Sequence, residues 1–419
     1  MTDDEDPLYP NGDRDGPPVS RRRLLAGSAA VGAAATAGCG SDGETTPGVT
    51  EAPTVVVFNT GDRSVSVVDA ERDEVVGTTP VGYASSFPSN QYAPELVDAG
   101  SEAFWGNVDG GVRAFGADDL SERARVETGS GFNWQERTPD GGTLVVSARE
   151  PAHTQYEIDA DPDSTEFGSV LRELDRTDEG GRGDNDGPGP CDVTVHPDGR
   201  YAYVPDLFGD TLTVLDVDAF EIETQVAVDP VDGRPAQPWM GTASRDGETL
   251  LVEHRTGVET VWDVSDPAAP VERARLGPDD GMGEGALTSE VTDDGGRGFV
   301  FTPDTGDVTV IDAENGTVAE RIDLGGAAFT GTWGPDRQSL YVPVQSADEV
   351  AVIDPEALAV TARLSVGAGP YGATAAGVRP DPEPARTEAA LGALGLLDSG
   401  TTYCIGNCAC GHDPSTNRM

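Results

Sequence analysis

The stretch Tyr201-Ala-Tyr-Val-Pro-Asp206, followed by Thr211-Leu-Thr-Val-Leu-Asp216, decides the fold expected for this chain. Apolar side chains alternate with small or polar ones in both halves, which is the pattern of a half-buried β-strand. Residues 207–210 join the halves, and their glycine and aspartate favour a tight turn. The stretch therefore predicts a β-hairpin whose second strand ends in aspartate.

Similar hairpins recur along the chain, from residue 54 to about residue 378. Close copies begin at Thr54, Leu250, Gly298 and Ser339, and weaker copies begin at Glu102 and Thr143. Most follow a turn such as Pro197-Asp-Gly199, which itself follows an inner strand such as residues 191–195. A fourth strand, such as residues 223–228, comes after the hairpin. Four strands at a period of roughly 40 to 60 residues predict the blades of a β-propeller.

The two ends of this repeating body complement each other. The first copy begins at Thr54 with what is the second strand of the other blades, and a surplus strand over residues 370–378 follows the last copy. We expect the surplus strand to complete blade one, because ring closure leaves no exposed sheet edge. The predicted fold class is all-β, a propeller of seven four-stranded blades. An eighth, incomplete blade is the alternative.

Two of the strand sequences carry a family resemblance. Tyr-Val-Pro-Asp at residues 203–206 and Thr-Val-Ile-Asp at residues 309–312 are similar to the YVTN repeat of surface-layer-type and YncE-like propellers. The resemblance implies the seven-bladed architecture. It leaves the activity open, since related propellers include binding proteins and redox enzymes.

The charge of the chain is extremely negative. Aspartate and glutamate number 75 against 27 basic residues, all of them arginine, for a net charge of −48. Self-repulsion of this size destabilises a compact protein in dilute salt. The Debye length falls to about 3 Å near 1 M salt, so concentrated salt removes that penalty. The lysine-free, acidic balance resembles proteins of haloarchaea. It argues against nucleic acid as a partner, because no basic stripe is available for phosphates.

The first 53 residues are expected to direct and tether the protein. Arg21 and Arg22 precede a short apolar stretch over residues 24–38, as in a signal peptide, and resemble the twin-arginine export signal. Residues 36–39 end in Cys39 and resemble a lipobox, which implies a lipid anchor on that cysteine. A plain signal with a chance cysteine is the alternative. Residues 40–53 are predicted to be a flexible tether on the outer face of the cytoplasmic membrane.

The starts of the inner strands are the candidate ligand site, because the inner strands of a propeller line its central channel. Aligning the repeats places comparable positions at Tyr92, Asn133, Cys191, Trp239, Leu287, Phe329 and Tyr371. Such a ring predicts an apolar, partly polar funnel that binds a ligand. Packing between neighbouring blades is the alternative. An error of one residue in the alignment would turn these side chains away.

The four histidines do not form an evident metal site. His153, His196 and His254 fall in different blades, and we expect them to be surface or loop residues. The chain also lacks a recognisable pairing of nucleophile and base, a phosphate loop and a haem-attachment motif.

The C-terminal tail over residues 379–419 is the exception. It holds Cys404, Cys408, Cys410 and His412 within nine residues, after a proline-rich linker and a short helix-like stretch. Three thiols and an imidazole suit zinc or copper(I). Two disulfides with Cys191 as the fourth thiol, or an untied tail, are the alternatives.

Three functions remain open on the sequence alone. The first is a monomeric, non-catalytic binding scaffold, anchored outside the cytoplasmic membrane, for an unknown protein or small molecule. The second is a redox or metal-handling protein that uses copper or zinc bound by the tail. The third is a hydrolase or lyase with a divalent ion held by channel carboxylates. We favour the first, because the repeats are regular and no catalytic set is recognisable.

Overall fold

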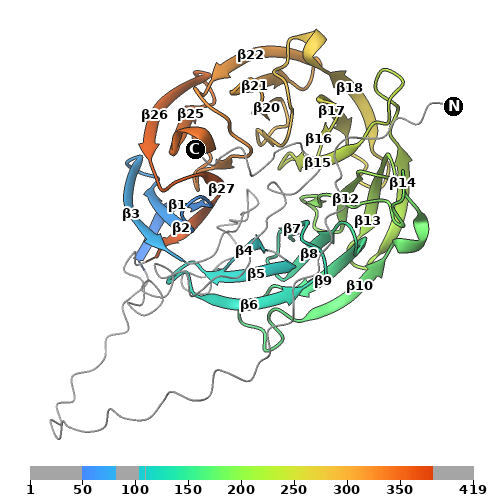
Figure 1. The fold of residues 1–419 in the computed structure, drawn as a ribbon, viewed down its shortest axis with the longest axis horizontal. Coiled ribbons are helices and arrows are strands. Elements are labelled where there is room, and N and C mark those ends of the chain that lie inside the picture. The colour runs from blue at the N-terminus through green and yellow to red at the C-terminus, as the bar shows by residue number, and fades with distance from the viewer. Residues whose placement is uncertain (1–49, 82–102, 109, 381–419) are drawn as a thin grey trace, which may run out of the picture. The chain divides into compact units, whose positions relative to one another are not determined.

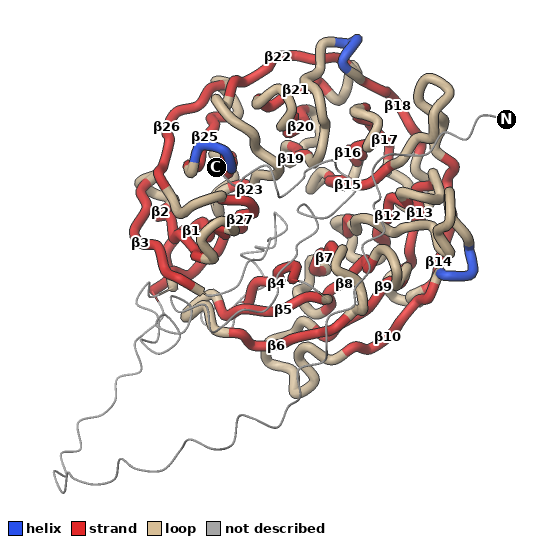
Figure 2. The backbone as a smooth tube through the Cα atoms, viewed as in Figure 1, coloured by secondary structure: helices blue, strands red, loops and turns tan. Residues whose placement is uncertain are grey.

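A computed structural model of the chain describes residues 50–81, 103–108 and 110–380. Over these residues the chain forms seven antiparallel β-sheets, which follow one another around a ring (Figure 1). The tube in Figure 2 shows the strands of each blade as successive arcs from the centre outward. The predicted seven-bladed, all-β propeller is therefore confirmed. No helix of the described residues is long and apolar enough to cross a membrane.

The strands of each blade follow one another from the innermost described strand to the outermost. Blade 1 contains β27 (Pro370–Arg379), β1 (Thr50–Asn59), β2 (Ser64–Asp69) and β3 (Glu74–Pro80). Blade 2 contains, among the described residues, β4 (Ala103–Val108), β5 (Gly111–Gly116) and β6 (Glu122–Glu127). Blade 3 contains β7 (Asn133–Arg137), β8 (Thr143–Ala148), β9 (Thr154–Asp159) and β10 (Val170–Asp175). Blade 4 contains β11 (Thr194–Val195), β12 (Tyr201–Asp206), β13 (Thr211–Asp216) and β14 (Glu221–Ala227).

The other three blades have the same order. Blade 5 contains β15 (Pro238–Ala243), β16 (Thr249–His254), β17 (Val258–Asp263) and β18 (Val271–Leu276). Blade 6 contains β19 (Ser289–Val291), β20 (Arg297–Thr302), β21 (Asp307–Asp312) and β22 (Thr317–Asp323). Blade 7 contains β23 (Thr332–Trp333), β24 (Leu340–Val344), β25 (Glu349–Asp354) and β26 (Ala359–Ser365). Short 3-10 helices span Thr177–Glu179, Pro278–Asp280 and Gln345–Ala347.

A repeated turn links the innermost strand of most blades to the next strand. In blade 3 the Thr138 hydroxyl donates to Asp140 Oδ1 (2.6 Å), and the Gly142 N–H donates to the same oxygen (3.0 Å). Gly141 lies between them with φ of 71°, a conformation that favours glycine. Blades 5 and 6 repeat the hydroxyl-to-aspartate bond at residues 244–246 and 292–294. The Asp-Gly pairs of blades 3, 5 and 6 thus set where the inner strands of these blades end.

Ring closure occurs in blade 1, where the two ends of the body pair. Strand β27 runs antiparallel to β1, with Val55 opposite Ala375. The backbone N–H groups of Thr60 and Gly61 donate to the carbonyl oxygens of Gly369 and Ala368, each at 2.9 Å. The expected strand at residues 370–378 therefore completes blade one, and the eighth-blade alternative is wrong.

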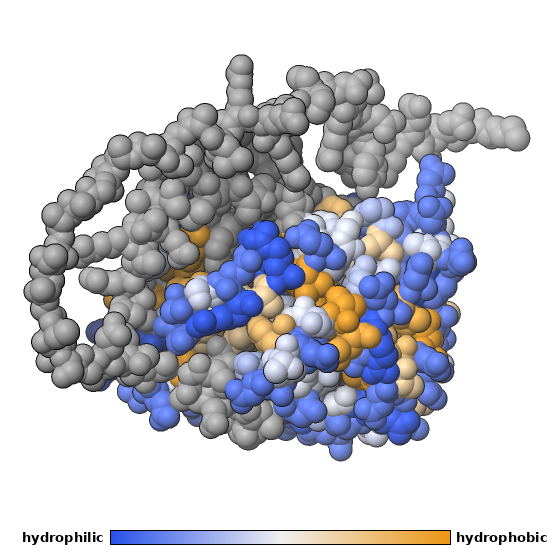
Figure 3. Space-filling view, turned by 90° about the horizontal axis from the view of Figure 1, so that it is seen from below, coloured by the Kyte–Doolittle hydropathy of each residue, from blue (hydrophilic) through white to orange (hydrophobic). Residues whose placement is uncertain are grey.

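Apolar clusters hold neighbouring blades together. In the described residues each of the seven junctions has its own buried cluster. Between blades 6 and 7, for example, the Phe299 and Trp333 rings meet edge to face at 5.7 Å. Valines of the middle strands, such as Val55 and Val56, are fully buried, and each contributes roughly 1.5–3 kcal/mol. Hydrophilic residues cover much of the face in Figure 3, with smaller hydrophobic areas between them.

Candidate functional site

An eighth apolar cluster lies where the inner strands begin, and it joins several blades instead of two. We call it the central aromatic cluster; its buried members are Trp134, Cys191, Leu207, Trp239, Met240, Leu287, Phe329 and Tyr371. They come from blades 1, 3, 4 and 5 and from the segments that lead into blades 6 and 7. Because each inner strand starts on the same face of the ring, residues far apart in sequence meet there.

The structure brings most of the predicted channel-mouth residues together. Cys191, Trp239, Leu287, Phe329 and Tyr371 all belong to the central aromatic cluster. The Phe329 and Tyr371 rings stack at 5.5 Å with an interplanar angle of 27°. Their arrangement joins the start of blade 7 to the strand that closes blade 1.

Asn133 has a different place from the one its alignment predicts. Its side-chain amide donates to the Ser130 carbonyl (2.7 Å) and accepts from the Thr128 hydroxyl (2.6 Å). It thus holds the loop that enters blade 3, and the next residue, Trp134, supplies the cluster side chain. Successive side chains of a strand point to opposite faces, so a shift of one residue in the alignment exchanges the roles of Asn133 and Trp134.

The outer edge of the cluster is half-buried. Phe132, Phe208 and Ala327 pack against the buried members and keep part of their surface exposed. Below them, Trp239 is only 5% exposed, and within the described part of the chain its indole N–H has no hydrogen-bond partner. A buried donor without a partner costs free energy, and a ligand oxygen that accepts its hydrogen bond would remove that cost.

A buried arginine underlies this edge. Arg149 is 1% exposed, and its guanidinium lies 4.4 Å from the centre of the Phe132 ring. It forms an ion pair with Glu150 and donates to Cys191 Sγ (3.5 Å). Burial raises the pKa of the Cys191 thiol to about 11. The free thiol therefore stays protonated at neutral pH and is a poor nucleophile.

Buried carboxyl groups lie in the strands beneath the cluster. Burial raises the pKa of Glu136 and of Glu253 to about 8, and it raises the pKa of Asp192 and of Glu259 as well. Glu136 Oε2 accepts from the Val195 N–H (2.8 Å). In the described residues no group of three or more His, Cys, Asp or Glu side chains is placed to hold a metal ion. Burial thus favours the neutral form of each of these carboxyls.

The histidines inside the ring serve local structure. His153, His196 and His254 are 3%, 7% and 0% exposed, so none of the three is a surface residue. His153 and His196 lie in loops, as expected, and His254 ends β16. Burial lowers the pKa of His254 to about 4, which keeps its ring neutral. Its Nδ1 lies 3.1 Å from the Ala236 carbonyl oxygen and its Nε2 lies 3.0 Å from Thr260 Oγ1. Both ring nitrogens of His254 therefore have a hydrogen-bond partner inside the protein.

Several predicted residues lie outside the described part of the chain. They are the signal residues Arg21 and Arg22, the anchor Cys39, the channel-mouth residue Tyr92, and the tail residues Cys404, Cys408, Cys410 and His412.

Sequence reasoning missed Arg149 and the two half-buried phenylalanines. Arg149 directly follows β8, and Phe208 lies just after β12, so both occupy the turns between the second and third strands. The repeat alignment considered only the starts of inner strands. A search for aromatic and basic residues in those turns would have found Arg149 and Phe208, while Phe132 directly precedes the inner strand β7.

Solved structures resemble this propeller without revealing its activity. The periplasmic gluconolactonase of Pseudomonas aeruginosa is 18% identical, with a TM-score of 0.59, over 77% of this chain and 98% of its own. A protein from Lactobacillus plantarum is 13% identical, with a TM-score of 0.62, over 77% and 99%. A functionally unknown protein from Desulfotomaculum acetoxidans is 14% identical, with a TM-score of 0.58, over 79% and 100%. At such identities the likeness shows the fold alone.

Neither a family model nor a curated protein matches the sequence.

Proposed function

We propose that this chain is a binding propeller whose ligand docks on the half-buried edge of the central aromatic cluster. The observation that carries the proposal is the convergence of aromatic side chains from several blades on one face, above a buried indole N–H without an acceptor among the described residues. Aromatic side chains provide large contact areas at low entropic cost, and a few buried polar groups provide specificity. The ligand class is a flat, mainly apolar molecule that carries a hydrogen-bond acceptor.

The charges at this edge favour a neutral ligand. The Arg149 guanidinium already pairs with Glu150, so it offers no net charge to an anion. Cys191 is protonated, and the carboxyls beneath are neutral when their pKa lies near 8. These groups suit recognition better than nucleophilic or general-base chemistry, which needs an ionised group beside the substrate.

Binding of Nile red, a neutral planar dye, tests the site. We expect the dye to fluoresce on binding to the wild type, and we expect Phe132→Ser combined with Phe208→Ser to weaken binding about tenfold or more. Val271→Ser is the matched control, because Val271 is 61% exposed on the outer strand β18. Circular dichroism verifies that each variant is folded. Equal dye binding by the double variant and the wild type would contradict the proposal.

We also propose that the protein works outside the cytoplasmic membrane, held there by a lipid on Cys39. The twin-arginine pair, the apolar stretch and the lipobox-like residues 36–39 support this location. Cys39→Ser should release the protein from the membrane fraction into the medium, and Arg21→Lys with Arg22→Lys should retain it inside the cell. Retention of the Cys39→Ser protein in the membrane fraction would exclude the lipid anchor.

A metal-handling role of the tail is the second candidate. It rests on the density of ligands, with Cys404, Cys408, Cys410 and His412 in nine residues. Purified protein should then contain copper or zinc in stoichiometric amount, and Cys404→Ser with Cys408→Ser should lose it. Metal-free protein with reduced thiols would rule this role out.

A further inference from the structure

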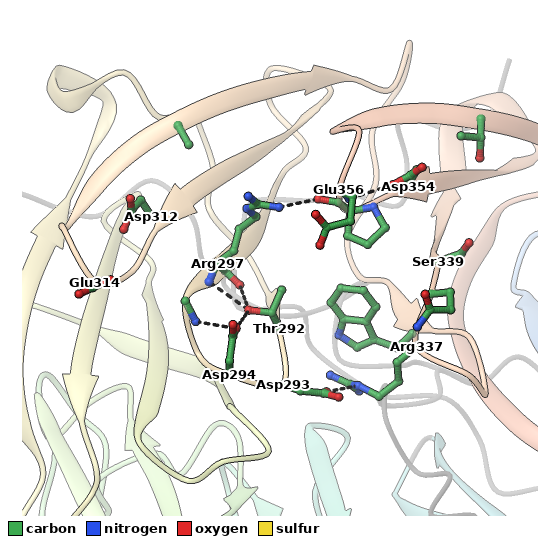
Figure 4. Close-up of a pocket in the computed structure, with 16 residues that line it drawn as sticks. Thr292, Asp293, Asp294, Arg297, Asp312, Glu314, Arg337, Ser339, Asp354 and Glu356 are labelled. Carbon is green, nitrogen blue, oxygen red and sulfur yellow. Dashed lines mark hydrogen bonds and ion pairs between the residues drawn. The ribbon is translucent and has the colours of Figure 1, made fainter.

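A cleft of about 840 Å³ lies between blades 6 and 7, at the strand ends opposite the central aromatic cluster. Figure 4 shows Arg297, Asp312 and Glu314 on one wall, with Arg337 and Glu356 on the other. The indole of Trp333 also lines it. The cleft is separate from the proposed docking edge, which lies where the inner strands begin.

One turn beside the cleft departs from the repeat. In blades 4, 5 and 6 the third turn position is Gly199, Gly247 and Gly295, each with φ between 67° and 75°. Blade 7 carries Arg337 there, with φ of 54°. This left-handed backbone conformation is energetically unfavourable for a residue that has a Cβ. A strained residue that breaks its own repeat is a pointer to function.

Two nearby positions, Trp333 and Arg297, also differ from the residues that other blades have at the same place in the repeat. Trp333 stands where the inner strands of blades 4 and 6 have valine, at Val195 and Val291. The Arg337 guanidinium lies 4.9 Å from the centre of the Trp333 ring and forms an ion pair with Asp293. The strained turn therefore places an arginine over the ring of a tryptophan at the cleft.

Arg297 is the third departure, because blades 3 and 5 have the shorter Thr143 and Thr249 at its position. Its guanidinium donates one hydrogen bond, to the Pro355 carbonyl oxygen (2.6 Å), and within the described residues it forms no ion pair. An arginine has five N–H donors. Arg297 thus has donors left for an acceptor in the cleft.

The carboxylates of the cleft do not by themselves select a cation. Six acidic residues and two arginines line it, a proportion close to the 75 acids and 27 basic residues of the whole chain. Asp294, Asp312 and Asp354 accept backbone N–H groups of their own turns, at 3.1, 2.9 and 2.8 Å. Among the described side chains no group of three or more acids is placed to hold a metal ion. The exposed Glu314 and Glu356 remain available as acceptors.

We infer that this cleft binds a neutral glycan. Sugar hydroxyls both accept and donate, so they match the free donors of Arg297 and the acceptors Glu314 and Glu356 on facing walls. An anion would meet six carboxylates, and a cation would leave the Arg297 donors unused. Exposed Ala319 supplies apolar surface for sugar C–H groups, while Trp333 and Pro355, which also line the cleft, are buried. The inference does not depend on the proposed function.

A printed array of neutral oligosaccharides, read in about 2 M KCl, tests the inference, because salt at that strength screens purely ionic binding. The wild type should bind at least one glycan. Arg297→Gln should weaken that binding about tenfold or more. Arg337→Gly, which restores the repeat residue and relieves its backbone, should lose it as well. Arg200→Gln is the matched control, because Arg200 follows the corresponding turn of blade 4 and should leave binding unchanged.

Two results would overturn the inference. One is an array on which the wild type and Arg297→Gln bind the same glycans equally or none at all. The other is binding of spermine, but of no neutral glycan, that depends on Glu314 and Glu356 and disappears in salt. Nile red binding reports on the opposite face, so a failure of glycan binding is distinguishable from a failure of the proposed function.

Discussion

Glu253 and Glu259 are the residues whose chemistry departs most from an ordinary surface acid. They face each other on β16 and β17 of blade 5 and are fully buried. Burial raises the pKa of Glu253 to about 8, and burial together with Glu253 raises the pKa of Glu259. Carboxyl groups with such pKa values are neutral when the folded protein is near neutral pH.

This neutrality predicts how stability depends on pH. The ordinary pKa of glutamate is 4.5 and the folded-state value for Glu253 is about 8, so the folded chain keeps a proton that the unfolded chain releases between these values. Stability should therefore fall as pH rises from 4.5 to 8. Glu253→Gln should reduce that slope by about 1.4 kcal/mol per pH unit, the value for one proton.

Urea unfolding at about pH 5, 6, 7 and 8 measures the effect. Glu223→Gln is the control, because Glu223 is exposed on the outer strand β14. If Glu253→Gln and Glu223→Gln give the same slope as the wild type, Glu253 is ionised in the folded protein.

At the scale of the element, the junction of β1 with β27 is a tightly constrained contact. A Cβ on Gly61 would lie 2.7 Å from the Ala368 backbone oxygen, in the segment that leads into β27. The Gly61 N–H bonds to that oxygen, so the two backbones cannot separate without losing a closure contact. Gly61 is therefore required for its small size.

Gly61→Ala should destabilise the ring by about 1–3 kcal/mol, the usual cost of overpacking a tight contact. Thermal unfolding measures the loss, and hydrogen exchange should show faster exchange in β1 and β27 than in the other strands. Gly142→Ala is the matched control, because a Cβ there would lie 3.5 Å from its nearest neighbour, the Asp140 side chain. Equal stability of both variants would mean that the closure can shift to accept a methyl group.

The elements themselves were largely predictable from the sequence, and the site was predictable only in part. Strand alternation and Asp-Gly turns are local signals, so blade number and closure followed from the repeats. The exchange of Asn133 and Trp134 depends on one residue of register, which the alignment does not fix. Glu253 and Glu259 were indistinguishable among 75 acids, because burial depends on which strand face meets the next blade. The Arg337 departure was visible, since Pro335-Asp336 lacks the following glycine.

At the scale of the whole molecule, the charge of −48 governs the conditions for folding. Ion pairs such as Arg176 with Asp206, both buried, neutralise only a minority of the acids. The remaining repulsion acts across the ring unless it is screened.

The melting temperature should therefore rise with salt. Screening lengths shorten from about 10 Å at 0.1 M to about 3 Å at 1 M, so most of the gain should occur within that range of KCl. Circular dichroism melts at increasing KCl measure it. Sucrose at matched osmolality is the control, because it does not screen charge. A melting temperature that KCl and sucrose raise equally would show that exclusion of cosolute, and not screening, stabilises the ring.

The pairing of β1 with β27 also dictates when the ring can finish during synthesis. Strand β1 is among the first described segments to leave the ribosome, yet its inner partner ends at Arg379, more than three hundred residues later. Until then one edge of β1 has no strand to pair with, so blade 1 of the nascent chain stays incomplete while the other blades fold. The last strand of the described residues is the one that lets β1 become stable, so completion of the ring follows translation of the chain as far as Arg379.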